Sequence, residues 1–240
     1  MAELTPAADE AASSTRFAKA HQDLRNLIIA GHFAPNVRLT EAELTSLLDV
    51  SRGTVRAVLV RLVHEGYLTS EPNRGVRTRT FDIDEAIAVL EAREVVEAAL
   101  AAKAAERATD EELQVLADIF EEMSGAEYAR AEATYSGLNR RFHAQVRAMS
   151  RQPILSSFIE DLVYPLVMRQ YRDQTREHPR RNSLAEHRAI LAAVQTRNPE
   201  AAHAAMRHHV ASARRALVLN AERDRAAGPP DRLHPVPDGA

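Results

Sequence analysis

The chain has 240 residues, of which 45% are apolar and 27% are charged, a composition typical of a globular protein with a substantial core. The absence of cysteine excludes disulfide frameworks, thiolate zinc fingers and cysteine nucleophiles. No apolar run approaches the roughly 20 residues of a membrane-spanning helix, and the Ala-rich, acidic residues 1–14 do not resemble a signal peptide. We therefore expect a cytoplasmic protein.

The net charge of −3 conceals an uneven distribution of charge along the chain. Residues 15–80 contain ten Lys or Arg residues and six Asp or Glu residues, so this part is basic and the remainder is acidic. A small basic part joined to a larger acidic part indicates that the first binds nucleic acid and the second has a different role. We expect residues 1–14 and 223–240 to be disordered tails.

The basic part is predicted to form three helices followed by a β-hairpin. The first helix ends at Gly31, a residue suited to the left-handed conformation that closes helices. Thr40 and Glu43 form a capping box at the start of the second helix, and Ser51 can cap the third. The predicted helices cover residues 17–30, 41–48 and 52–65, and the strands cover residues 67–70 and 76–80.

The start of the third helix carries side chains suited to DNA. Arg52, Thr54 and Arg56 lie in its first turns, directly after Ser51, and no acidic residue interrupts them. Arginine can bond bidentately to guanine in the major groove, and hydroxyls with helix N-terminal amides can hold a phosphate. The same pattern could be the solvated face of any small helical domain.

A basic hairpin turn, Asn73-Arg74-Gly75, follows this helix, which is the layout of a winged helix-turn-helix. From Gly31 to Gly75 the sequence resembles the GntR family of bacterial transcription regulators. The matching positions are Gly31, Pro35, Leu39, Glu41, Leu44, Val50, Ser51, Arg52, Val55, Arg56, Leu59, Leu62, Glu65, Gly66, Arg74 and Gly75. This resemblance implies DNA contacts by Arg38, Arg52, Thr54, Arg56, Arg74 and Gly75. The hydroxyl of Ser51 is a further expected contact. Residues 15–80 are accordingly expected to be a DNA-binding domain.

From Asp84 onward the sequence predicts only helices. We expect an antiparallel bundle of about six helices over residues 84–222, with Pro165 kinking or splitting one of them. The fold class is therefore mainly α. The predicted breaks lie near Thr109-Asp110, Ser124-Gly125, Gln152-Pro153, His178-Pro179 and Asn198-Pro199.

Three histidines lie on the apolar stripes of three of these helices. His143, His187 and His209 could converge on a divalent metal, because imidazole suits zinc, nickel or iron. Asn139 lies one turn before His143 and could add a carbonyl oxygen, whereas His208 is expected to face outward. Alternatively, each histidine could be a core residue whose polar atoms are satisfied by hydrogen bonds.

The bundle also resembles the FCD effector domain of FadR-type GntR regulators. The matching positions are Leu90, Arg93, Glu97, Asn139, Phe142, His143, Glu186, His187, Ile190, Leu191, Met206 and His209. The resemblance implies that Asn139, His143, His187 and His209 hold a divalent metal, with zinc the first choice. It also implies that Arg93 lies in the pocket, where it suits an organic-acid effector by bidentate pairing. Arg93 could instead pair with Glu97 on the same helix.

Together these features predict a DNA-binding transcription regulator, a repressor, that is not an enzyme. We expect a homodimer on pseudo-palindromic double-stranded DNA, controlled by a small carboxylate effector. Two alternatives remain. Three histidines with an open position also describe catalytic zinc in a metal-dependent hydrolase, although no HExxH motif accompanies them. The bundle could also serve only for dimerisation.

Overall fold

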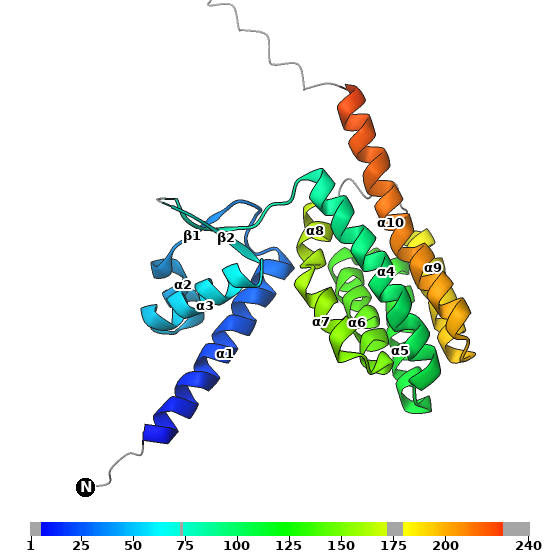
Figure 1. The fold of residues 1–240 in the computed structure, drawn as a ribbon, viewed down its shortest axis with the longest axis horizontal. Coiled ribbons are helices and arrows are strands. Elements are labelled where there is room, and N and C mark those ends of the chain that lie inside the picture. The colour runs from blue at the N-terminus through cyan, green and yellow to red at the C-terminus, as the bar shows by residue number, and fades with distance from the viewer. Residues whose placement is uncertain (1–5, 73, 172–179, 228–240) are drawn as a thin grey trace, which may run out of the picture.

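The structure, a computed structural model, describes residues 6–72, 74–171 and 180–227. Its N-terminal unit (residues 6–78) lies beside a larger helical bundle (residues 83–227), as Figure 1 shows. The N-terminal unit consists of α1 (Pro6–Ala30), β1 (Arg38–Leu39), α2 (Glu41–Leu48), α3 (Arg52–His64), β2 (Leu68–Glu71) and β3 (Gly75–Thr78). The bundle consists of α4 (Ile83–Arg107), α5 (Asp110–Tyr128), α6 (Glu132–Ser150), α7 (Pro153–Asp161), α8 (Tyr164–Gln170), α9 (Arg180–Gln195) and α10 (Pro199–Ala227).

In the N-terminal unit, the helix caps, the turns and the hairpin lie where the sequence predicts them. The Thr40 side chain accepts a hydrogen bond from the amide of Glu43, and the Glu43 carboxylate accepts one from the amide of Thr40, which completes the capping box of α2. Ser51 caps α3 in the same manner. Gly31 and Asn36 adopt the expected positive φ values of 94° and 60°. The hairpin β2–β3 is joined by β1, giving the antiparallel order β1-β3-β2.

Strand β1 and the ends of two helices differ from the sequence-based expectations. β1 has only two residues, and so short a strand shows no alternation of apolar and polar residues by which the sequence could predict it. α1 already begins at Pro6, so residues 6–14 are helical and not a disordered tail, in keeping with the high helix propensity of their Ala and Glu residues. α10 continues to Ala227 and thus includes the start of the predicted tail 223–240, whose last residues, 228–240, lie outside the described chain.

The described part of the bundle has seven helices where about six were expected. The predicted break at Ser124-Gly125 is wrong: α5 continues to Tyr128, because one glycine in a helix interior costs only about 1 kcal/mol. The breaks near Thr109, Gln152 and Asn198 are confirmed. Pro165 lies in the first turn of α8, so the expected split falls just before it, at Val163. The break predicted at His178-Pro179 lies outside the described residues.

Two large apolar cores and a smaller one hold the described part of the chain together, and one of the large cores crosses between its two parts. The bundle core gathers around Phe142, Leu116 and Val194. The second core joins Leu24 and Ile28 of α1 and other residues of the N-terminal unit to Val163, α8 and Leu217 of α10. The orientation of the two parts is therefore fixed by shared burial of apolar surface. No described helix combines the length and the apolar character that crossing a lipid bilayer requires.

We expect Leu217→Ala to destabilise the protein by about 2–5 kcal/mol, because Leu217 is fully buried in the core that joins the two parts. Leu219→Ala is the matched control, since its side chain lies two residues further along α10 and is 48% exposed; it should change stability by less than about 0.5 kcal/mol. The measurement is urea unfolding at one protein concentration. Equal losses for the two variants would mean that α10 does not reach this core.

Candidate DNA-binding surface and metal centre

The first turn of α3 presents its polar residues outward while its apolar residues hold the helix in place. Val55, Val58 and Leu59 are buried, whereas Ser51, Arg52 and Arg56 are exposed, and Thr54 is half-buried. The Ser51 hydroxyl accepts a hydrogen bond from the Thr54 amide at 3.2 Å. These four residues therefore form one accessible helix start, as the sequence predicts, and its amides and arginines suit a phosphate and base edges.

Arg56 has a partner that the sequence analysis missed. Its Nε donates to Oε1 of Glu41, the first residue of α2, at a distance of 2.7 Å. This hydrogen bond lowers the pKa of the Glu41 carboxyl, and the charges of Arg56 and Arg52 lower it further. The pair lies fifteen residues apart in the sequence, so no local spacing could reveal it. Glu41 holds one edge of the Arg56 guanidinium and leaves its other N–H donors accessible, since the side chain is exposed.

The hairpin brings two more of the predicted contact residues together. A Cβ atom at Gly75 would lie 3.4 Å from Arg38 Nε, and Gly75 has a φ of 78°, so glycine meets both the close approach and the backbone conformation. Arg74 is exposed and pairs with Glu71 at 3.2 Å. Asn73, the remaining residue of the predicted wing turn, lies outside the described residues.

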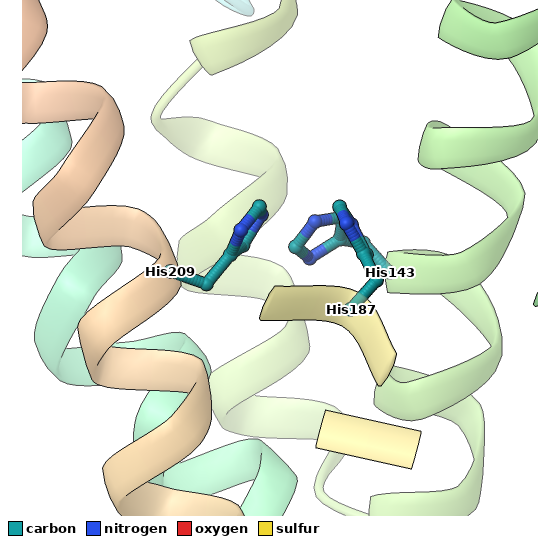
Figure 2. A group of neighbouring side chains, drawn as sticks. All are labelled: His143, His187 and His209. Atoms are coloured by element: carbon teal, nitrogen blue, oxygen red, sulfur yellow. The ribbon is translucent and has the colours of Figure 1, made fainter. Parts of the chain in front are cut away.

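His143 of α6, His187 of α9 and His209 of α10 meet inside the bundle, as Figure 2 shows. Their exposed fractions are 1%, 0% and 7%. One ring nitrogen from each lies within 4.8 Å of those of the other two. The helical phase predicted for these three residues is confirmed, as is that of His208, whose side chain is 64% exposed.

Each imidazole is oriented by an acceptor at its Nδ1 atom. Nδ1 donates to Glu97 Oε2 at 2.6 Å in His143, to the Ser183 carbonyl at 2.6 Å in His187, and to Glu186 Oε2 at 2.9 Å in His209. These partners select the tautomer whose lone pair is on Nε2, which is how metal-binding histidines are commonly held. The orienting roles of Glu97 and Glu186 could not be predicted from local spacing, because each carboxylate lies on a different helix from the histidine that it orients. The Ser183 acceptor lies one turn before His187 on α9, but it is a backbone carbonyl, which any residue type would supply.

The site fits a divalent cation for two reasons: its imidazoles are neutral, and a buried ring nitrogen has no hydrogen-bond partner. Burial lowers the pKa of His143 to about 4, and it also lowers the pKa values of His187 and His209, so all three rings are neutral at pH 7. Nε2 of His187 is buried and has no hydrogen-bond partner. An orphaned lone pair inside a core is costly, and a metal ion would satisfy it. Asn139 lies half-buried one turn before His143, and its role as a ligand stays a prediction.

Arg93 of α4 lies beside this cluster and is 3% exposed. Its Nε donates to Glu97 Oε1 at 3.0 Å, and its Nη2 lies 3.3 Å from His143 Nε2. The guanidinium carbon lies 4.1 Å from the centre of the Tyr164 ring, a cation–π contact that the sequence analysis missed. Burial alone would raise the pKa of Glu97, but the charge of Arg93 and the neighbouring His143 hold it well below its usual range. Arg93 thus lies next to the histidine cluster and forms the alternative pairing with Glu97, and its role in binding an effector stays a prediction.

The chain matches two family models, one for each part of the molecule. The model described as bacterial regulatory proteins, gntR family, matches residues 17–77. The FCD domain model matches residues 88–212 and so covers more than half of the chain. Both models describe transcription regulators, which sets the hydrolase alternative aside.

Individual relatives agree with the family models. The chain is 31% identical to the Nta operon transcriptional regulator of Aminobacter aminovorans over 137 residues, which are 57% of this chain and 64% of that regulator. This alignment therefore spans less than two thirds of that relative. The chain is 24% identical to the HTH-type transcriptional repressor RspR of Escherichia coli K12 over 187 residues, 78% of this chain and 82% of RspR.

Solved structures show the same fold. A GntR transcriptional regulator from Rhodococcus sp. RHA1 superimposes with a TM-score of 0.72 at 25% identity, covering 85% of this chain and 98% of its own. The N-terminal helices and hairpin and the bundle behind them therefore occur together in regulators of this kind. The chain belongs to the GntR family of DNA-binding transcription regulators and carries an FCD domain.

Proposed function

We propose that this GntR-family regulator is a repressor that holds a divalent metal in its FCD domain and responds to a small organic acid. The observation that carries the proposal is the buried trio of neutral histidines, each oriented through Nδ1, with Nε2 of His187 buried and lacking a hydrogen-bond partner. A bundle that served only for dimerisation would not require this arrangement, since apolar residues of similar volume would fill the space at lower cost.

The ligand set that we propose is His143, His187 and His209, with Asn139 as a fourth oxygen donor. Three imidazoles and one oxygen suit zinc, although nickel or iron would also accept them. When bound, the metal supplies a Lewis-acidic position at which a carboxylate oxygen can bind. Arg93 is placed to bind the other side of the same carboxylate, provided that the effector shares or replaces Glu97 as its partner.

DNA binding by two copies of the chain is the second part of the proposal. A single α3 offers few base contacts, whereas a homodimer with two-fold symmetry doubles them on a pseudo-palindromic site. The relative RspR is a transcriptional repressor, which supports the proposed direction of control. Light scattering of the protein with and without DNA measures the number of chains.

We expect double replacement of His187 and His209 by Ala to abolish stoichiometric zinc binding, because only one of the three imidazoles remains. The measurement is elemental analysis of untagged protein after dialysis against zinc, with circular dichroism to verify that helix content is kept. His208→Ala is the control, since its side chain is exposed and should leave the zinc content unchanged. Wild-type protein without bound metal would instead support a bundle that only dimerises.

We expect Arg52→Ala and Arg56→Ala each to remove about 1–3 kcal/mol of discrimination between a selected duplex and random DNA if the arginine reads a guanine. Arg56→Ala should weaken binding more than Arg52→Ala, because it also releases the Glu41 carboxylate from its hydrogen bond, next to the DNA phosphates. Adding Glu41→Gln to Arg56→Ala should recover part of that loss. The duplex is the tightest binder selected from a random library, and affinity is measured by fluorescence anisotropy. Equal weakening on both DNAs would show that the arginines bind phosphates.

We expect the response to small carboxylates to require Arg93. The variant Arg93→Met with Glu97→Gln removes both charges of the buried pair, so that neither is left without its partner. It should lose the thermal stabilisation that a panel of mono-, di- and tricarboxylates gives the zinc-loaded wild type. A variant that is stabilised at the same concentrations as the wild type would show that Arg93 does not bind the effector.

A further inference from the structure

Helix α8 packs against α4, the helix that carries Arg93, and against α1 of the N-terminal unit, and Figure 1 shows it on the side of the bundle that faces this unit. It has seven residues, Tyr164–Gln170, and three of its features stand outside the function proposed above. Its C-terminal end binds the end of α1 and the junction between the two parts. Its N-terminal end stacks on Arg93. A residue with an unfavourable backbone conformation precedes it.

Arg169 of α8 forms a C-terminal cap for α1 of the other part. Its Nη1 donates to the carbonyl of Ile28 at 2.7 Å, and its Nη2 donates to the carbonyl of Phe33. A Cβ atom at Gly31 would lie 3.0 Å from Arg169 Nε, so the glycine that ends α1 also makes room for this side chain. A cation at a helix C-terminus is stabilised by the helix dipole and by the last carbonyls.

The next two residues hold the junction before α4. The amide of Phe81 donates to Gln170 Oε1 at 3.0 Å, and Gln170 Nε2 donates back to the carbonyl of Phe81 at 2.6 Å. The Tyr171 hydroxyl donates to the same carbonyl at 2.7 Å. Phe81 therefore has both of its backbone polar groups bonded to the end of α8 and the residue that follows it.

The opposite end of α8 contacts Arg93, beside the histidine cluster, through the ring of Tyr164. Tyr164, the first residue of α8, is 7% exposed and lies beneath the Arg93 guanidinium at 4.1 Å. Arg93 Nη2 in turn lies 3.3 Å from Nε2 of His143, the atom that would bind the metal. Arg93 must therefore give up this contact when His143 Nε2 becomes a ligand, and the stacking on Tyr164 changes with it.

Val163 connects α7 to α8 with a φ of 46°, in the left-handed region that a β-branched residue rarely adopts. Such a conformation costs about 1–3 kcal/mol and persists only when the surroundings enforce it. The Val163 side chain is buried against the N-terminal unit, with its Cγ2 3.7 Å from where a Cβ of Gly66 would lie. Gly66 belongs to the turn that follows α3, so the strained residue borders the DNA-reading helix.

We propose that α8 transmits the state of the histidine cluster to the N-terminal unit. Tyr164 moves with Arg93, and Arg169 at the other end of α8 then holds or releases the end of α1. The inference rests on the proposed metal site. When Arg93 leaves His143, Tyr164 loses the cation above its ring, α8 shifts about Val163, and the cap that Arg169 provides for α1 loosens. The position of α3 relative to the bundle then depends on the pocket.

The test is hydrogen exchange of the full-length protein with zinc and with a chelator, read by mass spectrometry on peptides covering residues 27–33 and Phe81. The amides of Gly31 and His32 bond within the capped turn, and that of Phe81 bonds to Gln170, so these peptides report on α8 directly. Zinc should accelerate exchange in both peptides by at least about fivefold, the lower end of usual couplings between sites.

Two variants test the contributions of the two ends of α8 separately. Arg169→Met keeps the length of the side chain but removes its donors, and Tyr164→Leu removes the ring beneath Arg93. Both should show the fast exchange of residues 27–33 even with chelator, and zinc should change it less than about twofold while still binding stoichiometrically. Tyr164→Phe keeps the ring and should respond like the wild type. Arg141→Met, which removes the exposed ion pair between Arg141 of α6 and Glu122 of α5, is the surface control and should also respond normally.

The outcomes distinguish this inference from the function on which it rests. Failure of zinc to bind the wild type would overturn the proposed metal site and this inference together. Stoichiometric zinc with changes in exchange confined to α4, α6, α9 and α10 would leave the metal site standing and overturn the role of α8. A full zinc response in both Arg169→Met and Tyr164→Leu would overturn it as well.

Discussion

The apolar core that α1 shares with α8 and α10 is the constraint on which the arrangement of the whole molecule depends. Leu24 and Ile28 are buried on one side of it and Val167 and Leu217 on the other. Domains joined only by a linker are expected to move relative to each other, but burial of large side chains at a contact restricts that motion. Helix α3, for which we propose the DNA contacts, packs on α1 and is thereby held in a defined position relative to the histidine cluster.

Desolvation determines the protonation and the hydrogen bonding of the histidine cluster. Removing three imidazoles from water keeps them neutral, which is the form that binds metal, and the same burial requires every remaining polar atom to find a partner. Glu97 and Glu186 meet this requirement at Nδ1 of His143 and His209, and the Ser183 carbonyl meets it at His187. Nε2 of His187 is buried without a hydrogen-bond partner, which is the reason that we interpret the cluster as a binding site and not as core packing.

The sequence predicted features that depend on local spacing and missed those that depend on pairing across the fold. Caps at Thr40 and Ser51, the inward phase of each of the three histidines and the split before Pro165 all follow from patterns within one or two turns. The meeting of the histidines was implied by the resemblance to the FCD domain. The strand β1, the Glu41–Arg56 bond and the roles of Glu186 and Tyr164 require knowledge of which elements meet. The error at Gly125 has a different origin, because the burial of Met123 and Ala126 outweighs the weak helix propensity of one glycine.

The buried pair Arg93–Glu97 links these constraints. Ion pairs buried in a core contribute little net stability compared with apolar residues of the same size, so stability alone does not account for this one. Its geometry does: the Glu97 carboxylate bonds to Arg93 and to Nδ1 of His143 at once, while Arg93 stacks on Tyr164 at the start of α8. A change in what His143 or Arg93 binds therefore cannot stay local. It must alter either the orientation of a metal-binding ring or the end of the helix on which the N-terminal unit rests.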